Sequence, residues 1–223
     1  MPLEYAKLSS RQLEEVAGRA IAVLPLGSLE QHCEGPLGFD SLVAERLAWR
    51  ACEELERRGK LCVILPTLHY GFSPEWSEVR GTISLDLKTY SSLLSSILEA
   101  LFKVGFRRIA LLNAHGGNAG LLEAIARELS RDGLAIGVIN YWQALGISLD
   151  HAGPAETEVA RALGLEAGFG RCEEEVGHER PTIVAGKARR TAGMSGRAQE
   201  VSETAERVAL ALERLYEARG TLI

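Results

Sequence analysis

Four short apolar runs, separated by longer segments with helical periodicity, limit the folds open to this chain more than any other feature. The runs cover residues 21–26, 61–65, 109–112 and 135–141, and the helical segments between them cover residues 41–58, 87–104 and 120–131. Strands that are apolar throughout are buried on both faces, which is typical of a parallel sheet covered by helices. The alternation therefore predicts an α/β fold of three layers, α/β/α, around a mostly parallel central sheet.

Two further helices are expected near the ends of the chain. Ser9 and Gln12 form a capping-box pattern at the start of a helix that runs to about Arg19. Residues 199–219 place apolar side chains on one side of a closing amphipathic helix. The glycine-rich and charged residues 164–196 fit neither pattern, and their role stays open. No repeat or linker divides the sequence, so we expect a single domain over residues 1–223.

Composition narrows the class of partner. The formal net charge of -5 argues against a nucleic-acid or anionic-membrane binder, because both need a basic surface, and it favours a small molecule. No apolar run approaches the roughly 20 residues of a membrane span, and the first residues carry no targeting pattern. Cys33, Cys52, Cys62 and Cys172 show no C-x-x-C spacing or disulfide framework, so we expect reduced thiols and a cytoplasmic protein.

The loop after the first apolar run carries Glu30, His32 and Asp40. Ligands of open parallel sheets bind beyond the carboxyl ends of the strands, which is where this loop is expected to lie. Imidazole together with carboxylates suits a divalent ion such as zinc, manganese or iron. Alternatively, Asp40 only caps the helix that starts at Ser41, Glu30 is a solvated acid and His32 makes a local hydrogen bond.

A second loop, residues 113–118, follows the third run and brings His115 to the same edge of the sheet. Gly116 and Gly117 allow close backbone approach, and their N–H groups lie at the start of a helix. They could therefore hold a carboxylate, a phosphate or an oxyanion. The alternative is a tight turn with a buried, hydrogen-bonded histidine.

A third group consists of Asp150, His151 and Glu156, which are expected after a strand and at the start of a helix. A carboxylate at this position can complete a metal site, and Asp150 could orient His151. Alternatively, Glu156 only complements the helix dipole behind Pro154. Three loops that each supply histidine with carboxylates or glycines favour a shared site.

The motifs of these loops resemble the creatininase (creatinine amidohydrolase) family, in order across roughly residues 20–160. The matching segments are Leu24–His32, Asp40, Tyr70–Glu75, Gly81–Leu85, Asn113–Asn118 and His151–Thr157. The resemblance implies an α/β/α fold, two divalent metal ions and hydrolysis of an amide or cyclic amide, usually in a homohexamer. Zinc is the first expectation for the ions, with manganese or iron as alternatives.

The resemblance also assigns roles to residues. It implies that Glu30, His32, Asp40 and His115 are metal ligands, with Asp40 bridging, and that Glu156 completes the metal and catalytic site. His151 would transfer a proton near the substrate. We expect the neighbouring loops to shape the substrate pocket through Ser73, Trp76, Gly116, Gly117 and Asn118.

The chain departs from the family pattern at several positions. It is one residue shorter between His32 and Asp40, and Trp76 stands where the family often has a histidine. Gly116 and Gly117 stand where the creatinine-hydrolysing branch has an acid shortly after the histidine. The two glycines argue against creatinine as the substrate, whereas the other departures concern the register of Asp40 and the shape of the substrate pocket.

Three functional hypotheses follow. The first is metal-dependent hydrolysis of a carbon–nitrogen bond in a small amide, cyclic amide or formamide by an activated water. The second, implied by resemblance to archaeal members of the family, is deformylation of a formylaminopyrimidine nucleotide in flavin or deazaflavin biosynthesis. The third is a noncatalytic protein that binds metal or phosphate.

Overall fold

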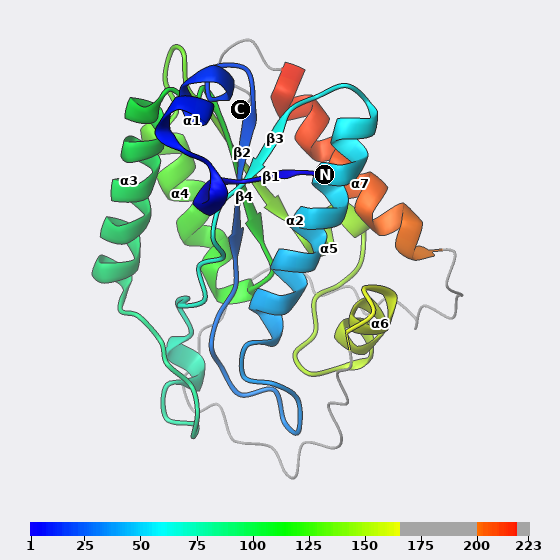
Figure 1. Ribbon diagram of the computed structural model, residues 1–223. Coiled ribbons are helices and arrows are strands. Elements are labelled where there is room, and N and C mark those ends of the chain that lie inside the picture. Colours follow the sequence, from blue (N-terminus) through cyan, green and yellow to red (C-terminus); the bar gives the residue numbers. More distant parts are fainter. Residues whose placement is uncertain (166–199, 218–223) are drawn as a thin grey trace.

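The central sheet of the computed structural model has five parallel strands, in the order β1-β3-β2-β4-β5 (Figure 1). The structure describes residues 1–165 and 200–217. The strands are β1 (Leu3–Glu4), β2 (Ile21–Leu26), β3 (Cys62–Ile64), β4 (Arg108–Asn113) and β5 (Ala135–Asn140). The predicted parallel sheet is therefore confirmed, and the two-residue β1 is the strand that the sequence pattern did not reveal.

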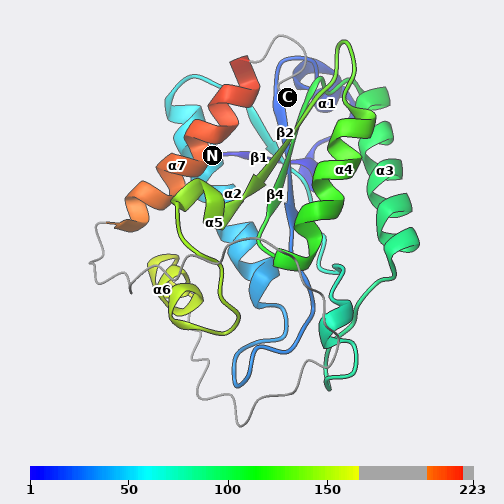
Figure 2. The same cartoon turned by 180° about the vertical axis from the view of Figure 1, so that it is seen from behind.

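Helices cover both faces of the sheet (Figures 1 and 2). The helices are α1 (Ser10–Val16), α2 (Phe39–Arg57), α3 (Leu87–Val104), α4 (Ala119–Leu129), α5 (Tyr141–Leu145), α6 (Pro154–Ala162) and α7 (Glu200–Glu217). Short 3-10 helices occupy Tyr5–Lys7, Pro74–Trp76 and Gly116–Asn118. The α/β/α prediction is confirmed, and no helix of the described ranges combines the length and apolar character that a bilayer span requires.

Alternating strand residues fill two separate cores. Ile21 and Val23 of β2 pack with α2 and α7, whereas Ala22 and Leu24 pack with α3 and α4 on the opposite face. Successive side chains of a strand point to opposite faces, so an uninterrupted apolar run serves both cores. This explains why β2 is buried at all six positions.

Helix starts follow local capping chemistry. Ser9 and Gln12 form the predicted capping box of α1, and the Asp86 side chain caps α3. Helix α2 starts at Phe39, two residues earlier than predicted, with Gly38 as its N-cap. Asp40 therefore lies inside the first turn and does not cap the helix, so that alternative for Asp40 was wrong.

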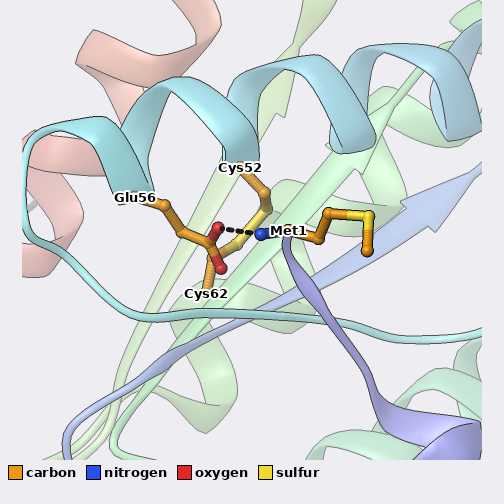
Figure 3. Close-up of a disulfide and its surroundings, with 4 residues drawn as sticks. All are labelled: Met1, Cys52, Glu56 and Cys62. Atoms are coloured by element: carbon orange, nitrogen blue, oxygen red, sulfur yellow. Dashed lines mark ion pairs between the residues drawn. A yellow bond between two sulfur atoms is a disulfide. The ribbon is translucent and has the colours of Figure 1, made fainter.

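The expectation that the cysteines are reduced thiols was wrong for Cys33, Cys52 and Cys62, which are all disulfide-bonded. Cys52 of α2 and Cys62 of β3 form a disulfide, and both are fully buried (Figure 3). The chain reverses at Gly59, whose φ is 75°, and α2 packs back on β3, which brings the two Cα atoms to 5.7 Å. The argument from reduced thiols to a cytoplasmic location therefore loses this support.

The surroundings of this disulfide include the start of the chain. The amino group of Met1 lies 3.2 Å from Glu56 Oε2, beside Cys52 and Cys62 (Figure 3). Cys172 and residues 166–196 of the open segment lie outside the described residues.

Candidate metal centre

Five buried side chains converge at the carboxyl edge of the sheet. Strands β2 and β4 are neighbours with Leu26 opposite Asn113, so the loops that follow them leave the sheet together. The first turns of α2 and α6 face the same place, at the lower edge of the sheet in Figure 1. The side chains, each at most 4% exposed, are Glu30, His32, Asp40, His115 and Glu156.

These side chains form two groups that share Asp40. In the first, His115 Nδ1 lies 3.2 Å from Glu30 Oε1 and 3.0 Å from Asp40 Oδ2. In the second, His32 Nε2 lies 3.3 Å from Asp40 Oδ1 and 3.8 Å from Glu156 Oε2. Within each group the ligand atoms lie within 4.8 Å of one another. Each group therefore supplies one imidazole and two carboxylates, a donor set that suits a divalent ion.

Charge and hydrogen bonding in the centre also favour a cation. Glu30 Oε2 is buried and has no hydrogen-bond partner among the described residues. Burial of a carboxylate oxygen without a partner is unfavourable, and a bound cation would satisfy it. The donor set and this oxygen both fit a divalent ion.

The histidines and Asp40 of the centre shift one another's pKa values. Burial alone would lower the pKa of His32, but its hydrogen bond to Asp40 and the charges of Asp40 and Glu156 raise it to about 9. The pKa of His115 is likewise raised well above its usual value, because bonds to Asp40 and Glu30 outweigh burial. Burial would raise the pKa of Asp40, yet the two histidines lower it to about 2.

The third carboxylate behaves differently. Burial, followed by the charge of Asp40, raises the pKa of Glu156 to about 8. Its Oε2 accepts a hydrogen bond of 2.8 Å from the N–H of Ala152. The Asp150 carboxylate accepts from the N–H groups of Ala155 at 2.9 Å and Glu156 at 3.2 Å. Asp150 therefore fixes the start of α6 and the position of Glu156, whereas we had expected it to orient His151.

His151 lies at the edge of the centre. It does not directly follow a strand, as the sequence had suggested, because α5 intervenes after β5. Its Nε2 lies 2.8 Å from the carbonyl oxygen of Gln31, and its Nδ1 lies 3.5 Å from Glu30 Oε1. The side-chain amide nitrogen of Gln31 also lies 3.0 Å from Nε2. The carbonyl would accept from Nε2 and the amide would donate to it, so the two contacts favour opposite tautomers. Nδ1 is the nitrogen that faces the carboxylates. Burial and then the charge of His32 lower the pKa of His151.

Trp76 covers His151. The two rings stack with centroids 4.2 Å apart and planes 22° apart. The side chain of His151 is 25% exposed, so this aromatic pair forms the solvent side of the centre. Trp76 thus lies beside the solvent side of the centre, and its contact with substrate stays a prediction.

Two other predicted substrate residues are fully buried behind the centre. Ser73 Oγ lies 3.1 Å from His115 Nε2, on the side of the ring away from Glu30. Asn118 donates to the carbonyl of Gly27 at 3.1 Å and accepts from the N–H of Phe72 at 3.0 Å. In this structure they hold loops and a histidine, and their contact with substrate stays a prediction.

The two glycines after His115 are required by packing. A Cβ on Gly117 would lie 2.2 Å from the carbonyl oxygen of Phe72 and 2.5 Å from His115 Nε2. A Cβ on Gly116 would lie 2.8 Å from the side chain of Leu149. The atoms close to these glycines are protein atoms, so close approach to a ligand and anion binding by their N–H groups stay predictions.

Sequence reasoning missed Tyr141 near this centre. Its side chain is 1% exposed directly after β5, and burial followed by the charges of Glu156 and Asp40 raises its pKa well above the usual value. Its position after the fourth apolar run was the available signal, but it was counted as the end of the strand.

Comparisons with known proteins agree with this arrangement. A family model described as "Creatininase: Creatinine amidohydrolase" matches residues 6–209. The creatinine amidohydrolase of Pseudomonas putida is 27% identical over 175 residues, which cover 66% of this chain and 65% of that protein. The mycofactocin precursor peptide peptidase of Mycobacterium ulcerans (strain Agy99) is 31% identical over 151 residues, covering 65% of this chain and 58% of that protein. The chain thus spans less than two thirds of the length of either relative.

The fold has close counterparts among solved structures. The structure "Creatininase Mn" is 25% identical, covers 73% of both chains and has a TM-score of 0.63. A putative creatinine amidohydrolase from Bacteroides fragilis, 24% identical, covers 96% of this chain and 93% of that chain with a TM-score of 0.65. The second likeness concerns the fold alone.

Proposed function

The chain belongs to the creatininase family, and from this membership and the centre described above we propose that it is a metal-dependent hydrolase. It would cleave a carbon–nitrogen bond in a small amide, cyclic amide or formamide. The observation that carries the proposal is the pair of buried groups that share Asp40, each with one histidine and two carboxylates.

We assign two divalent ions to this pair. Glu30, Asp40 and His115 would hold one ion, and His32, Asp40 and Glu156 the other, with Asp40 bridging. Zinc is the first expectation, and manganese or iron suits the same donors. Such ions, when bound, supply Lewis acidity and make a water nucleophilic near neutral pH.

His151 is the candidate proton-transfer residue. Both contacts of Gln31 are to its Nε2, and Nδ1 is the nitrogen that faces the centre. Nδ1 can accept a proton as the water attacks and donate it to the leaving nitrogen. Glu156 is the second candidate for proton transfer, since its pKa of about 8 is close to neutral pH.

The substrate would meet the centre on its solvent side. Trp76 offers an aromatic face there, and the Gly116 and Gly117 N–H groups could bind the oxyanion that forms on the attacked carbonyl. Similarity to a creatinine amidohydrolase and to a peptide peptidase supports amide hydrolysis as a class. A formylaminopyrimidine nucleotide is our alternative substrate, and homohexamer assembly remains a proposal from the family resemblance.

The test starts with elemental analysis of the purified full-length protein, with metal stoichiometry per chain. Activity is then measured in the metal found, by creatinine ring opening, formate release from formylaminopyrimidine nucleotides and cleavage of short peptides. We expect two ions per chain and turnover of at least one amide. Two ions without turnover of any amide would favour the noncatalytic alternative.

Variants test the ligand assignment. His115→Ala and Glu30→Ala should lose bound metal and activity together, whereas the exposed Asp132→Ala should retain both. Full metal content in both ligand variants would overturn the assignment.

A further inference from the structure

The two ring nitrogens of His115 face different surroundings. Nδ1 points at Glu30 and Asp40, at 3.2 and 3.0 Å. Nε2 lies 3.1 Å from the carbonyl oxygen of Phe72 and 3.1 Å from Ser73 Oγ. Only Nδ1 is therefore directed at the place assigned to an ion, and Nε2 is anchored behind it.

The contacts of His115 Nε2 with Phe72 and Ser73, which we call the anchor, determine where the hydrogen atoms lie. A carbonyl oxygen only accepts, so His115 Nε2 must carry a hydrogen and donate it toward Phe72 and Ser73. The Ser73 hydroxyl therefore accepts from the ring and has its own hydrogen left to donate. Ser28 Oγ, 2.5 Å away, is placed to receive it. The chain of hydrogen bonds thus runs from His115 through Ser73 to Ser28.

This anchor is closed to solvent and tightly packed. Ser28 and Ser73 are both 0% exposed. A Cβ on Gly117 would collide with His115 Nε2, and one on Gly71 would lie 3.0 Å from Ser28 Cβ. The N–H of Ser73 is also held, by Ser84 Oγ at 2.9 Å. Neither water nor substrate reaches the Ser73 hydroxyl, so its partners are those inside the protein.

We propose that Ser73, held by Ser28, is a positioning residue that aims the Nδ1 lone pair of His115 at the ion shared with Glu30 and Asp40. The proposal rests on the proposed function, because it concerns one of the two ions assigned there. A hydrogen bond to the second nitrogen of a histidine ligand fixes its tautomer and its ring plane, and its loss typically weakens metal binding about 10- to 100-fold. Phe72 fixes the tautomer, and Ser73 adds the second contact that holds the plane.

The test titrates metal-free full-length protein with Zn²⁺ against a chromophoric competing chelator. We expect two binding steps in the wild type. In Ser73→Ala one step should weaken by about 10- to 100-fold, and the other, assigned to His32 and Glu156, by less than about threefold. Ser28→Ala should weaken the same step by a smaller factor. Co²⁺ absorption spectra, which report ligand geometry, should change for that ion alone.

Ser77→Ala is the matched control. Ser77 lies in the same loop, is exposed and bonds to the carbonyl of Pro74, so its variant should bind both ions as the wild type does. Unchanged affinity for both ions in Ser73→Ala, with only a raised KM, would overturn the proposal and make Ser73 a substrate contact. Equal weakening of both steps would indicate a general structural role and would also overturn it.

Nitrogen-15 NMR of the wild-type imidazoles tests the same idea without any variant. His115 should be protonated at Nε2 with and without Zn²⁺, and Zn²⁺ should bind at Nδ1. An unprotonated Nε2 in either state contradicts the anchor, even if no ion binds. Absence of any metal binding by the wild type would instead contradict the proposed function, so the two failures are distinguishable.

Discussion

Replacing Asp40 by Asn is the sharpest single perturbation of the centre. The amide keeps the shape of the carboxylate but removes its charge and its ability to ligate through two anionic oxygens. Oδ1 faces His32 at 3.3 Å and Oδ2 faces His115 at 3.0 Å, so both groups lose the residue that they share. We expect the affinity for both ions to fall, whereas Glu156→Gln should affect mainly one.

The pKa of Asp40 sets the size of the effect. Its decrease from 3.8 to about 2 shows that the two imidazoles stabilise the carboxylate despite its burial. This decrease corresponds to roughly 2 kcal/mol. Divalent ions would carry at least the charge of the imidazolium groups that they replace. We therefore expect Asp40→Asn to weaken each ion by about 100-fold or more.

Metal stoichiometry and affinity provide the measurement. Native mass spectrometry should show two ions in the wild type, mainly one in Glu156→Gln, and few or none in Asp40→Asn at the same free Zn²⁺ concentration. Asp132→Asn, which changes an exposed carboxylate, is the matched control. Two ions in Asp40→Asn at wild-type affinity would refute the bridging role, and loss of one ion alone would show that the groups do not share this residue.

Three further predictions follow from the same structure. Metal loading at pH 7 should release about two protons or more, because the pKa values of His32 and Glu156, about 9 and about 8, lie above 7. Calorimetry in buffers of different ionisation enthalpy measures this number, and release of less than one proton would contradict these protonation states. The metal-free protein should lose stability as pH rises from 6.5 to 9, because folded His32, with a pKa of about 9, holds its proton more tightly than the unfolded chain does. The loss from His32 amounts to ~3 kcal/mol and is absent below pH 6.5. Calorimetry with a chelator present measures it, and a gain in stability between pH 6.5 and 9 would contradict the prediction. The Cys52–Cys62 disulfide closes a loop with a sequence separation of 10, so its reduction should lower the free energy of unfolding by about 3 kcal/mol. Urea titrations with and without reductant measure this difference, and an unchanged midpoint would contradict the prediction.

The sheet and its loops were predictable because their signal is local. Ile21–Leu26 reads as a buried strand from its own six residues, and Gly105, with φ of 120°, marks the end of α3. The rule that parallel strands present their loops at one edge then brings His32 and His115 together without knowledge of the strand order. β1 has two residues, too few to form a pattern, and it was missed for that reason.

The roles of loop residues were less predictable because a loop has no period that assigns its side chains to inside or outside. Ser73 and Trp76 are three residues apart, yet Ser73 lies behind His115 and Trp76 lies on the solvent side of His151. The disulfide was missed for a related reason. Cys52 and Cys62 meet only because α2 packs back on β3, and spacing in the sequence does not express that contact.

Backbone strain beside the centre connects the fold to the proposed chemistry. Among the described residues, Cys33 and Ala152 are the non-glycine positions with positive φ, at 54° and 49°. Each directly follows a histidine of the centre, and their N–H groups donate to Gln31 Oε1 at 3.1 Å and Glu156 Oε2 at 2.8 Å. Such conformations cost about 1–3 kcal/mol each and persist where the surroundings require them. A chain that needed only a stable sheet would place glycine or a relaxed turn at these positions, so the strain is best explained by the placement of His32, His151 and Glu156.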